Sequence, residues 1–363
     1  MPQKLSIIGS TGSIGTQCLD IVRSRPDEFE VVALAAGSKI DLLKEQIKEF
    51  KPKYICINNN EARKILASEF PQIIMLKDIV EIAALENIDI VVSAIVGIAG
   101  LEANIKALSK AKRVAIANKE TLVAAKDLVR ESINKYKSEL IPIDSEHVAI
   151  HQCLKQEDIN SVQEILLTSS GGPFRTWSIK DFDKITIEQA LNHPTWKMGP
   201  KITIDSSTLV NKGLEIIEIN SLFDIDYDKI QVVIHPQSIV HSAVTFVDGN
   251  TIAQLSSTDM RVPIQYALDY PARKAIKSSK SFSIFEHGKL EFEKPDFQKF
   301  PALALAYAAG KKQGIAPSIY NSANEVAVEL FLQAKIPYSQ IIKIIESELN
   351  QEYNIIKPSI QDI

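Results

Sequence analysis

Two carboxylates stand close together in the segment Ile141–His147, which reads Ile-Pro-Ile-Asp-Ser-Glu-His. If Ile141–Ile143 forms a strand, Asp144 and Glu146 point to one face, because side chains alternate along a strand. A third carboxylate, Glu215, follows in Asn-Lys-Gly-Leu-Glu. Oxygen donors of this kind select a hard divalent cation such as Mg²⁺ or Mn²⁺ over zinc or copper. The sequence therefore predicts a metal site formed by these three carboxylates.

A glycine-rich turn near the start of the chain could bind a dinucleotide. The strand-like run Leu5–Ile8 leads into Gly9-Ser-Thr-Gly-Ser-Ile-Gly15 and then into an amphipathic helical pattern. Such glycines allow a tight turn and let backbone N–H groups approach a pyrophosphate. A plain turn is the alternative for the motif taken alone, since its spacing varies from the usual form. Its position between a strand and a helix favours the dinucleotide.

The end of the second predicted strand indicates which nicotinamide cofactor is bound. Enzymes that prefer NAD usually carry an acidic residue there, which binds the ribose 2′-hydroxyl. Here the strand ends Leu-Ala-Ala-Gly37-Ser38-Lys39, without a carboxylate to repel a 2′-phosphate. The hydroxyl and the cation could hold that phosphate, so NADP is favoured. A surface role for Lys39 is the alternative.

A turn and a loop in the second half could bind an anion and cover a ligand. Thr168-Ser-Ser-Gly-Gly-Pro-Phe174 ends a predicted strand with a glycine pair, which would expose N–H groups beside Ser170. Asn192–Pro200 mixes Trp and Met with Pro, Gly, Asn and Lys, a composition that suits a lid rather than a regular element. A plain turn and a structural role for His193 are the alternatives.

A second group of polar residues is expected around a helix start. Asp205-Ser-Ser-Thr208 follows a predicted strand, Lys201–Ile204, and precedes a long helical pattern. Helix capping alone would explain these residue types. Yet Ser206, Asn211 and Lys212 supply a hydroxyl, an amide and a cation, which suit a phosphate at a helix N-terminus.

The same helix carries Glu215 three residues after Lys212, about 4.5 Å along the axis. One helix could therefore hold a phosphate near its start and a metal a turn further on, an arrangement that fits a short phosphorylated substrate. Glu218, one turn beyond Glu215, either supports the metal or is solvated.

The elements that must position these groups follow a βαβ rhythm over the first 145 residues, which predicts a doubly wound parallel sheet. The expected strands, apolar on both faces, are Leu5–Ile8, Val31–Ala36, Tyr54–Ile57, Ile73–Leu76, Ile90–Ser93, Val114–Ala117 and Leu140–Ile143. A second sheet is expected from Ile165–Ser169, Lys201–Ile204, Gln231–Ile234, Ile239–Val247 and Ile252–Ser256, with helices at Thr208–Asn220 and Asp259–Asp269. The end of the chain is expected to be helical at Ala302–Gln313, Ile319–Lys335 and Tyr338–Gln351.

These patterns predict an α/β fold with an N-terminal Rossmann-like doubly wound sheet, an α+β catalytic domain and a C-terminal helical bundle. We assign residues 1–148 to the cofactor domain and 149–270 to the catalytic domain with its lid at 192–200. Residues 271–300 are expected to be a linker, and residues 301–363 the helical domain.

Bulk properties narrow the class of protein. The 363 residues carry a net charge of −4, which gives no electrostatic footprint for nucleic acid or an anionic membrane surface. The longest apolar run, Ile90–Leu101, is 12 residues, short of the roughly 20 that span a bilayer. The three cysteines show no metal or redox spacing, so we expect buried, reduced thiols in a cytoplasmic protein.

The motifs, taken in order, resemble those of the 1-deoxy-D-xylulose 5-phosphate reductoisomerases. The resemblance extends through Asn321–Glu325, over nearly the whole chain. It rests on Gly9–Gly15, Ala117–Glu120, Ile143–His147, Ser170–Phe174, His193–Gly199, Asp205–Glu215 and His235–His241.

This resemblance implies conversion of 1-deoxy-D-xylulose 5-phosphate to 2-C-methyl-D-erythritol 4-phosphate, in the non-mevalonate route to isoprenoid precursors. It also implies NADPH, Mg²⁺ or Mn²⁺, and a homodimer. A divalent cation would polarise the substrate carbonyl as a Lewis acid. The carbon skeleton would rearrange to an aldehyde, which NADPH would reduce.

The resemblance also implies a role for each matching residue. The catalytic residues would be Lys119, Asp144, Glu146 and Glu215, and the last three would be the metal ligands. The substrate would be bound by Ser145, Glu146, Ser170, His193, Ser206, Asn211, Lys212 and Glu215. The NADPH site would comprise Thr11, Gly12, Ser13, Ile14, Gly37, Ser38, Lys39, Asn118, Lys119, Glu120 and Gly199. Family members often carry a basic or small residue followed by Asn where this chain has Ser38-Lys39, so which of the two meets the 2′-phosphate stays open.

Two other functions fit parts of the pattern. A plain NADP-dependent dehydrogenase of a small phosphorylated substrate would need no metal and gives no reason for three converging carboxylates. A catalytically silent NADP-binding regulator would bind the cofactor without turnover and would tolerate loss of Glu215.

Overall fold

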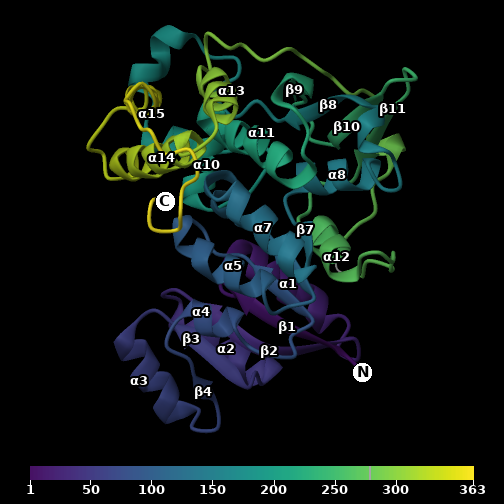
Figure 1. The fold of residues 1–363 in the computed structure, drawn as a ribbon, viewed down its shortest axis with the longest axis vertical. Helices are drawn as coiled ribbons and strands as arrows, with labels where there is room; N and C mark the ends of the chain where they lie inside the picture. The colour runs from purple at the N-terminus through teal and green to yellow at the C-terminus, as the bar shows by residue number, and fades with distance from the viewer. Residues whose placement is uncertain (278) are drawn as a thin grey trace. The chain divides into compact units, whose positions relative to one another are not determined.

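The computed structural model describes residues 1–277 and 279–363, which form two compact units (Figure 1). Unit 1 comprises residues 1–121, 127–144 and 259–280, and unit 2 comprises residues 122–126, 145–258 and 281–363. Ser278, within the predicted linker, lies outside the described residues. The predicted functional boundaries after residues 148, 270 and 300 stay predictions.

Unit 1 is built on a parallel seven-stranded sheet in the order β4-β3-β2-β1-β5-β6-β7. This arrangement confirms the predicted Rossmann-like sheet. Residues such as Leu5 and Ile7 of β1 are fully buried, as strands covered on both faces require. The strands are β1 (Gln3–Ile8), β2 (Phe29–Ala36), β3 (Tyr54–Ile57), β4 (Ile74–Met75), β5 (Ile90–Ser93), β6 (Arg113–Ile116) and β7 (Glu139–Pro142).

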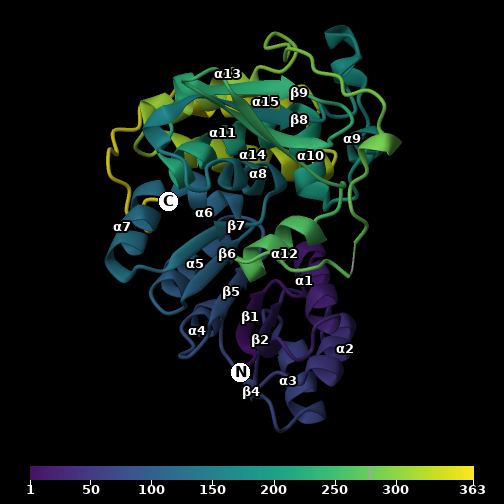
Figure 2. The same ribbon diagram turned by 90° about the vertical axis from the view of Figure 1, so that its right-hand side faces the viewer.

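Helices cover both faces of this sheet, with α1, α2 and α3 on one side and α4 and α5 on the other (Figure 2). Helices α6 and α7 follow one another closely, separated only by Ala125. The helices are α1 (Ser13–Arg23), α2 (Ile40–Phe50), α3 (Asn60–Glu69), α4 (Ile79–Ala83), α5 (Leu101–Leu108), α6 (Lys119–Ala124), α7 (Lys126–Tyr136) and α12 (Arg261–Asp269). The strand order reverses between β1 and β5, and ligands of doubly wound sheets bind at such a switch point.

Unit 2 contains a four-stranded sheet in the order β11-β10-β8-β9. The strands β8 and β9 are parallel, whereas β10 is antiparallel to both of its neighbours. An Asp-Gly turn joins β10 to β11, and its Gly249 adopts φ +85°. The strands are β8 (Val162–Ser169), β9 (Ile230–Ile234), β10 (Val240–Phe246) and β11 (Thr251–Leu255).

The helices of unit 2 share one hydrophobic core with this sheet. Leu167 of β8, Leu214 of α11 and Tyr320 of α14 all belong to that core and are 0% exposed. The C-terminal helices therefore pack on the sheet-bearing unit rather than around a separate core. The helices are α8 (Ser145–Cys153), α9 (Ile187–Leu191), α10 (Pro200–Thr208), α11 (Val210–Phe223), α13 (Ala302–Lys312), α14 (Ala316–Leu332) and α15 (Gln340–Leu349).

The strand predicted at Lys201–Ile204 is wrong, because these residues belong to helix α10. The alternating branched residues of Lys-Ile-Thr-Ile resemble a strand, but Pro200 occupies the first turn of the helix, where proline favours a helical start. Asp205–Thr208 therefore forms the end of α10, and of these residues Thr208 also accepts the N–H of Val210, the first residue of α11, at 3.3 Å. The residue between α10 and α11 is Leu209, in the left-handed region at φ +59°.

The described part of the predicted linker has little regular structure. It contains a short 3₁₀ turn at Ile284–Glu286 and one antiparallel bridge between Glu293 and Ile234. Among the described residues, none of the helices has the length and apolar character needed to cross a membrane.

Candidate active site

The glycine-rich turn of unit 1 follows β1 at the switch point of the sheet. The backbone N–H groups of Gly9 and Ser10 both donate to the carbonyl oxygen of Ala35 at 2.9 Å. Gly9 adopts φ +93°, and a Cβ on Gly15 would overlap the Gly9 carbonyl. Helix α1 then starts after Gly12 without a side-chain cap, which leaves its first N–H groups available for an anion.

Lys39 reaches toward this turn from the end of β2. Its side chain is exposed, and Nζ lies 3.4 Å from the carbonyl oxygen of Thr11. Gly37 has open space where a side chain would be. A cation beside the phosphate-binding turn supports the predicted NADP preference. Sequence patterns missed Gln46 of α2, whose amide donates to the carbonyl oxygen of Ser10 at 2.9 Å.

Asn118 and Lys119 stand at the end of β6 in unit 1. The amide of Asn118 donates to the carbonyl oxygens of Ile95 and Gly97 at 3.1 and 3.0 Å, and also to the Glu120 carboxylate. These contacts fix the segment that carries Lys119. The Lys119 ammonium forms an ion pair with Asp144, which lies two residues after the end of β7.

The structure changes the explanation of why Asp144 and Glu146 are neighbours. Glu146 does not continue a strand, because Ser145 begins helix α8. The turn from strand to helix, not strand alternation, brings the two carboxylates together. One carboxylate oxygen from each of Asp144, Glu146 and Glu215 lies within 4.8 Å of the other two.

Glu215 is held on α11 by two residues of the preceding turn. The Lys212 ammonium lies 2.5 Å from Glu215 and 2.7 Å from Glu146, so it bridges their carboxylates. Asn211 donates from Nδ2 to Oε1 of Glu215 at 2.6 Å. Glu215 is only 1% exposed, and a buried carboxylate needs such compensation.

This donor set fits a divalent cation. Three carboxylates supply only oxygen ligands, and the Lys212 ammonium already occupies the space between two of them as a positive charge. Oxygen-only ligation suits Mg²⁺ or Mn²⁺.

Glu218 is not solvated, which excludes one of the two alternatives for it. It is 2% exposed, and its carboxylate lies 3.9 Å from Nε2 of His147. Nε2 of His147 also lies 3.3 Å from the carbonyl oxygen of Glu215. His147 was not predicted as a site residue, although it closes the Asp-Ser-Glu-His motif. Asp144, His147 and Glu218 form a second group of possible ligands within 4.8 Å.

Ser170 and His193, two residues of unit 2 that the resemblance assigns to the substrate, contact each other. Nε2 of His193 lies 3.2 Å from the Ser170 hydroxyl. Nδ1 accepts backbone N–H groups from Thr195 and Trp196 at 3.1 and 3.0 Å, so the proton of a neutral ring resides on Nε2. Burial lowers the pKa of His193 to about 4, which keeps the ring a neutral donor near pH 7.

Ser206 lies in the last full turn of α10 and is partly buried. The glycine pair of the Ser170 turn approaches its backbone, since a Cβ on Gly172 would lie 2.8 Å from the carbonyl oxygen of Ser206. The two predicted anion-binding segments therefore pack against each other. Gly199, a predicted NADPH contact, caps the opposite end of α10 and is exposed.

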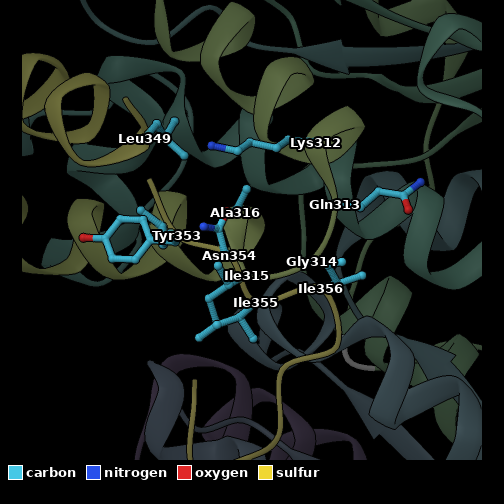
Figure 3. Close-up of a pocket in the computed structure, with 11 residues that line it drawn as sticks. Lys312, Gln313, Gly314, Ile315, Ala316, Leu349, Tyr353, Asn354, Ile355 and Ile356 are labelled. Atoms are coloured by element: carbon cyan, nitrogen blue, oxygen red, sulfur yellow. The ribbon is translucent and has the colours of Figure 1, made fainter. Parts of the chain in front are cut away.

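A cavity of about 420 Å³ opens beside Ser170, between the glycine turn and the lid segment. Its lining includes Gly172, Trp177, Asn192 and Thr195. A second cavity, of about 180 Å³, lies between the α13–α14 turn and the C-terminal segment (Figure 3). Lys312 is its one charged lining residue, so it offers no cluster of titratable groups.

The remaining candidates are structural. Nε2 of His235 accepts from the backbone N–H groups of Ile239 and Val240 at 3.1 and 3.2 Å. All three cysteines are buried free thiols, and burial raises the pKa of Cys56 and Cys153 to about 11. The expectation of buried, reduced cysteines is confirmed.

We expect His193 to contribute to acid sensitivity. Its folded pKa lies below the ordinary histidine value of 6.5, so its stabilising contribution is complete above pH 6.5 and decreases toward pH 4. The free energy of unfolding of His193→Gln should therefore decrease less between pH 6.5 and pH 4 than that of the unaltered chain. Denaturant titration at each pH measures this difference. An identical pH dependence in both proteins would show that His193 does not titrate in this range.

Comparison with known proteins agrees with this site. Three family models cover most of the chain: 1-deoxy-D-xylulose 5-phosphate reductoisomerase at residues 5–126, its C-terminal domain at residues 140–223, and the DXP reductoisomerase C-terminal domain at residues 255–363. The enzyme of this name from Caldanaerobacter subterraneus is 49% identical, over 99% of this chain and 95% of the relative. That from Clostridium perfringens is 49% identical, over 97% and 94%.

Solved structures give the same result over the full length. The reductoisomerase from Zymomonas mobilis in complex with NADPH superposes with a TM-score of 0.92 at 36% identity, covering 100% of this chain and 95% of the other. A DOX-P reductoisomerase in complex with NADPH, fosmidomycin and magnesium gives 0.91 at 42% identity, covering 96% and 90%. The chain belongs to the 1-deoxy-D-xylulose 5-phosphate reductoisomerase family.

Proposed function

We propose that this chain isomerises and reduces 1-deoxy-D-xylulose 5-phosphate to 2-C-methyl-D-erythritol 4-phosphate with NADPH and Mg²⁺ or Mn²⁺. The observation that carries this assignment is the carboxylate group around Lys212, in a chain about half identical to curated reductoisomerases. Solved relatives bind NADPH and magnesium, and two of them bind fosmidomycin.

The metal would be held by Asp144, Glu146 and Glu215. When bound, it would supply Lewis-acid polarisation of the substrate carbonyl and its neighbouring hydroxyl. Asn211 orients the Glu215 carboxylate through a 2.6 Å hydrogen bond, and Ser145 donates to Glu146 at the same distance. The protein thus fixes the direction of two ligands before any ion arrives.

The phosphate end of the substrate would be bound by Ser170, His193, Ser206, Asn211 and Lys212. The neutral His193 ring offers its Nε2–H, and Lys212 offers a positive charge on the first turn of α11, where helix N–H groups also favour an anion. Binding energy from this remote phosphate can close the lid and so raise the rate as well as the affinity.

The NADPH pyrophosphate would lie on the N-terminus of α1, and Lys39 would meet the 2′-phosphate. Lys39 is favoured over Ser38 because its ammonium already lies beside the Thr11 carbonyl. Asn118 and Glu120 would hold their segment in place by the hydrogen bonds described above. A homodimer and a cytoplasmic location are also proposed.

The two rival functions leave part of the site unexplained. A plain dehydrogenase needs no divalent ion, yet the buried Glu215 shares one lysine with the partly buried Glu146. Burying a carboxylate costs desolvation free energy, and such groups cluster at binding and catalytic sites. A silent regulator gives no reason for either the carboxylates or the phosphate residues.

The deciding experiment is NADPH oxidation, followed by absorbance, with 1-deoxy-D-xylulose 5-phosphate as substrate. We expect turnover that EDTA abolishes and that Mn²⁺ or Mg²⁺ restores. Turnover that persists after complete metal removal would favour the plain dehydrogenase. Cofactor binding without any turnover would favour the regulator.

Glu215→Gln should lower turnover by orders of magnitude and weaken Mn²⁺ binding. The amide keeps the shape of the side chain but removes the charge that a divalent ion needs. Direct Mn²⁺ titration and NADPH binding should be measured together, and we expect NADPH affinity to stay unchanged. Undiminished Mn²⁺ affinity and activity would remove Glu215 from the metal site.

Lys212→Ala should chiefly weaken binding of the phosphorylated substrate. Loss of a charge-assisted contact of about 1.5–3 kcal/mol corresponds to a rise in KM of roughly tenfold or more. KM for NADPH serves as the internal control and should not change. An unaltered KM for the sugar phosphate would contradict a role of Lys212 in phosphate binding.

A further inference from the structure

A buried hydrogen bond joins the C-terminal helix α14 to helix α10. Asn324 of α14 donates from Nδ2 to Oδ1 of Asp205 at 2.8 Å. Asn324 is 0% exposed and Asp205 is 1% exposed, so both groups are removed from water. The other carboxylate oxygen of Asp205 lies 2.7 Å from the ammonium of Lys201, one turn earlier on α10.

The carboxylate of Asp205 sets the orientation of the Asn324 amide. An amide turned the other way would place its oxygen against a carboxylate oxygen, which is repulsive. In the orientation observed, Oδ1 of Asn324 is buried without a hydrogen-bond partner among the described residues. The amide therefore gives up one hydrogen bond of its own while it holds Asp205, which is energetically unfavourable for a buried group.

A second buried contact lies on the other side of Ser206. Tyr338 donates from its hydroxyl to Ser207 Oγ at 3.1 Å, and Ser207 donates to the carbonyl oxygen of Ile204 at 2.7 Å. Ser206 is partly buried and lies between Asp205 and Ser207. Both of these residues form polar contacts with the C-terminal region. The ring of Tyr338 also packs on Phe174 at 5.3 Å between centroids.

Helix α14 also approaches α11, at the segment that carries Lys212 and Gly213. The hydroxyl of Tyr320 would overlap a Cβ at Gly213, so this glycine lets the two helices come close. Gly213 follows Lys212 directly in the chain. Contacts from α14 therefore reach both segments that carry the proposed phosphate residues, before and after Leu209.

We propose that Asn324 is a positioning residue that, through Asp205, fixes Ser206 and the α10–α11 turn for the substrate phosphate. This inference rests on the proposed function. Asn324 touches neither substrate nor cofactor; it acts on the end of α10. Ser206 lies one residue from Asp205, and Asn211 and Lys212 follow across Leu209, so a shift of this end would move all three groups together.

The test compares steady-state constants of Asn324→Ala with those of the unaltered chain. We expect KM for 1-deoxy-D-xylulose 5-phosphate to rise about tenfold, which corresponds to about 1.4 kcal/mol. The turnover number should change less than about twofold, and KM for NADPH should be unchanged. Equilibrium binding of the sugar phosphate without NADPH should weaken by the same factor.

A double exchange tests whether the hydrogen bond itself matters. Asp205→Asn with Asn324→Asp reverses donor and acceptor and retains the number of carboxylates. Because the exchange also removes the ion pair between Lys201 and Asp205, we expect partial rescue: KM should lie clearly below that of Asp205→Asn alone. The loss of a generic packing contact would not be rescued in this way.

Tyr307→Phe is the matched control. It removes a hydrogen bond of 2.8 Å from the same group of C-terminal helices to the carbonyl oxygen of Ile230, away from α10. It should lower the melting temperature without changing KM for the sugar phosphate. If Asn324→Ala does not fold, Tyr338→Phe takes its place, with a smaller rise in the same KM expected.

The outcomes separate this inference from the proposed function. An active unaltered chain with no KM change in Asn324→Ala, or an equal change in Tyr307→Phe, would overturn the inference alone. An unaltered chain that does not oxidise NADPH with this substrate would overturn the proposed function. In that case the inference is tested by calorimetric titration of both proteins with inorganic phosphate. The inference requires that Asn324→Ala binds phosphate more weakly than the unaltered chain.

Discussion

The lysine that bridges Glu146 and Glu215 is the interaction on which the rest of the site depends. Glu215 is buried and Glu146 is partly buried, so their mutual repulsion and lost hydration must be offset by positive charge between them. The Lys212 ammonium supplies that charge at 2.7 and 2.5 Å. This arrangement supports the proposed divalent-ion site, because the fold already tolerates this density of negative charge. The same lysine is also the cation that we propose for phosphate binding at the start of α11.

The scaffold explains how such a group is kept in place. Glu146 lies in the first turn of α8 and Glu215 lies within α11, whereas Asp144 directly precedes α8, so the backbone of two helices defines where these carboxylates start. On α11, Asn211 and Lys212 precede Glu215 by four and three residues, the spacings at which helix side chains meet. Behind this face, the core shared by the sheet and the C-terminal helices leaves little room for movement. Rigid elements rather than loops thus carry most of the proposed chemistry.

Most of the fold could be predicted from the sequence, and the failures have clear physical causes. Apolar runs separated by helical periods identified the parallel sheet, because strands buried on both faces leave a continuous apolar signature. The strand predicted at Lys201–Ile204 was wrong because branched residues occur in both helices and strands. Pro200, which favours a helix start, lies just outside the run. For the site, residue types predicted the carboxylates, but strand alternation was the wrong reason for Asp144 and Glu146. The burial of His147 and Glu218 beside the carboxylates was not predicted, because burial depends on tertiary packing, which local spacing does not reveal.

The connection between α10 and α11 shows why distant residues matter to a site built from local motifs. Leu209 adopts a left-handed conformation that a non-glycine residue reaches at some energetic cost. Such a conformation persists only when its surroundings hold it, and the flanking helices are held by Asn324, Tyr338 and Tyr320 from the C-terminal region. The hydroxyl, amide and ammonium of the turn lie on both sides of this strained residue. On the proposed assignment the C-terminal region takes part in substrate binding indirectly, because its contacts stabilise the backbone that carries these three groups.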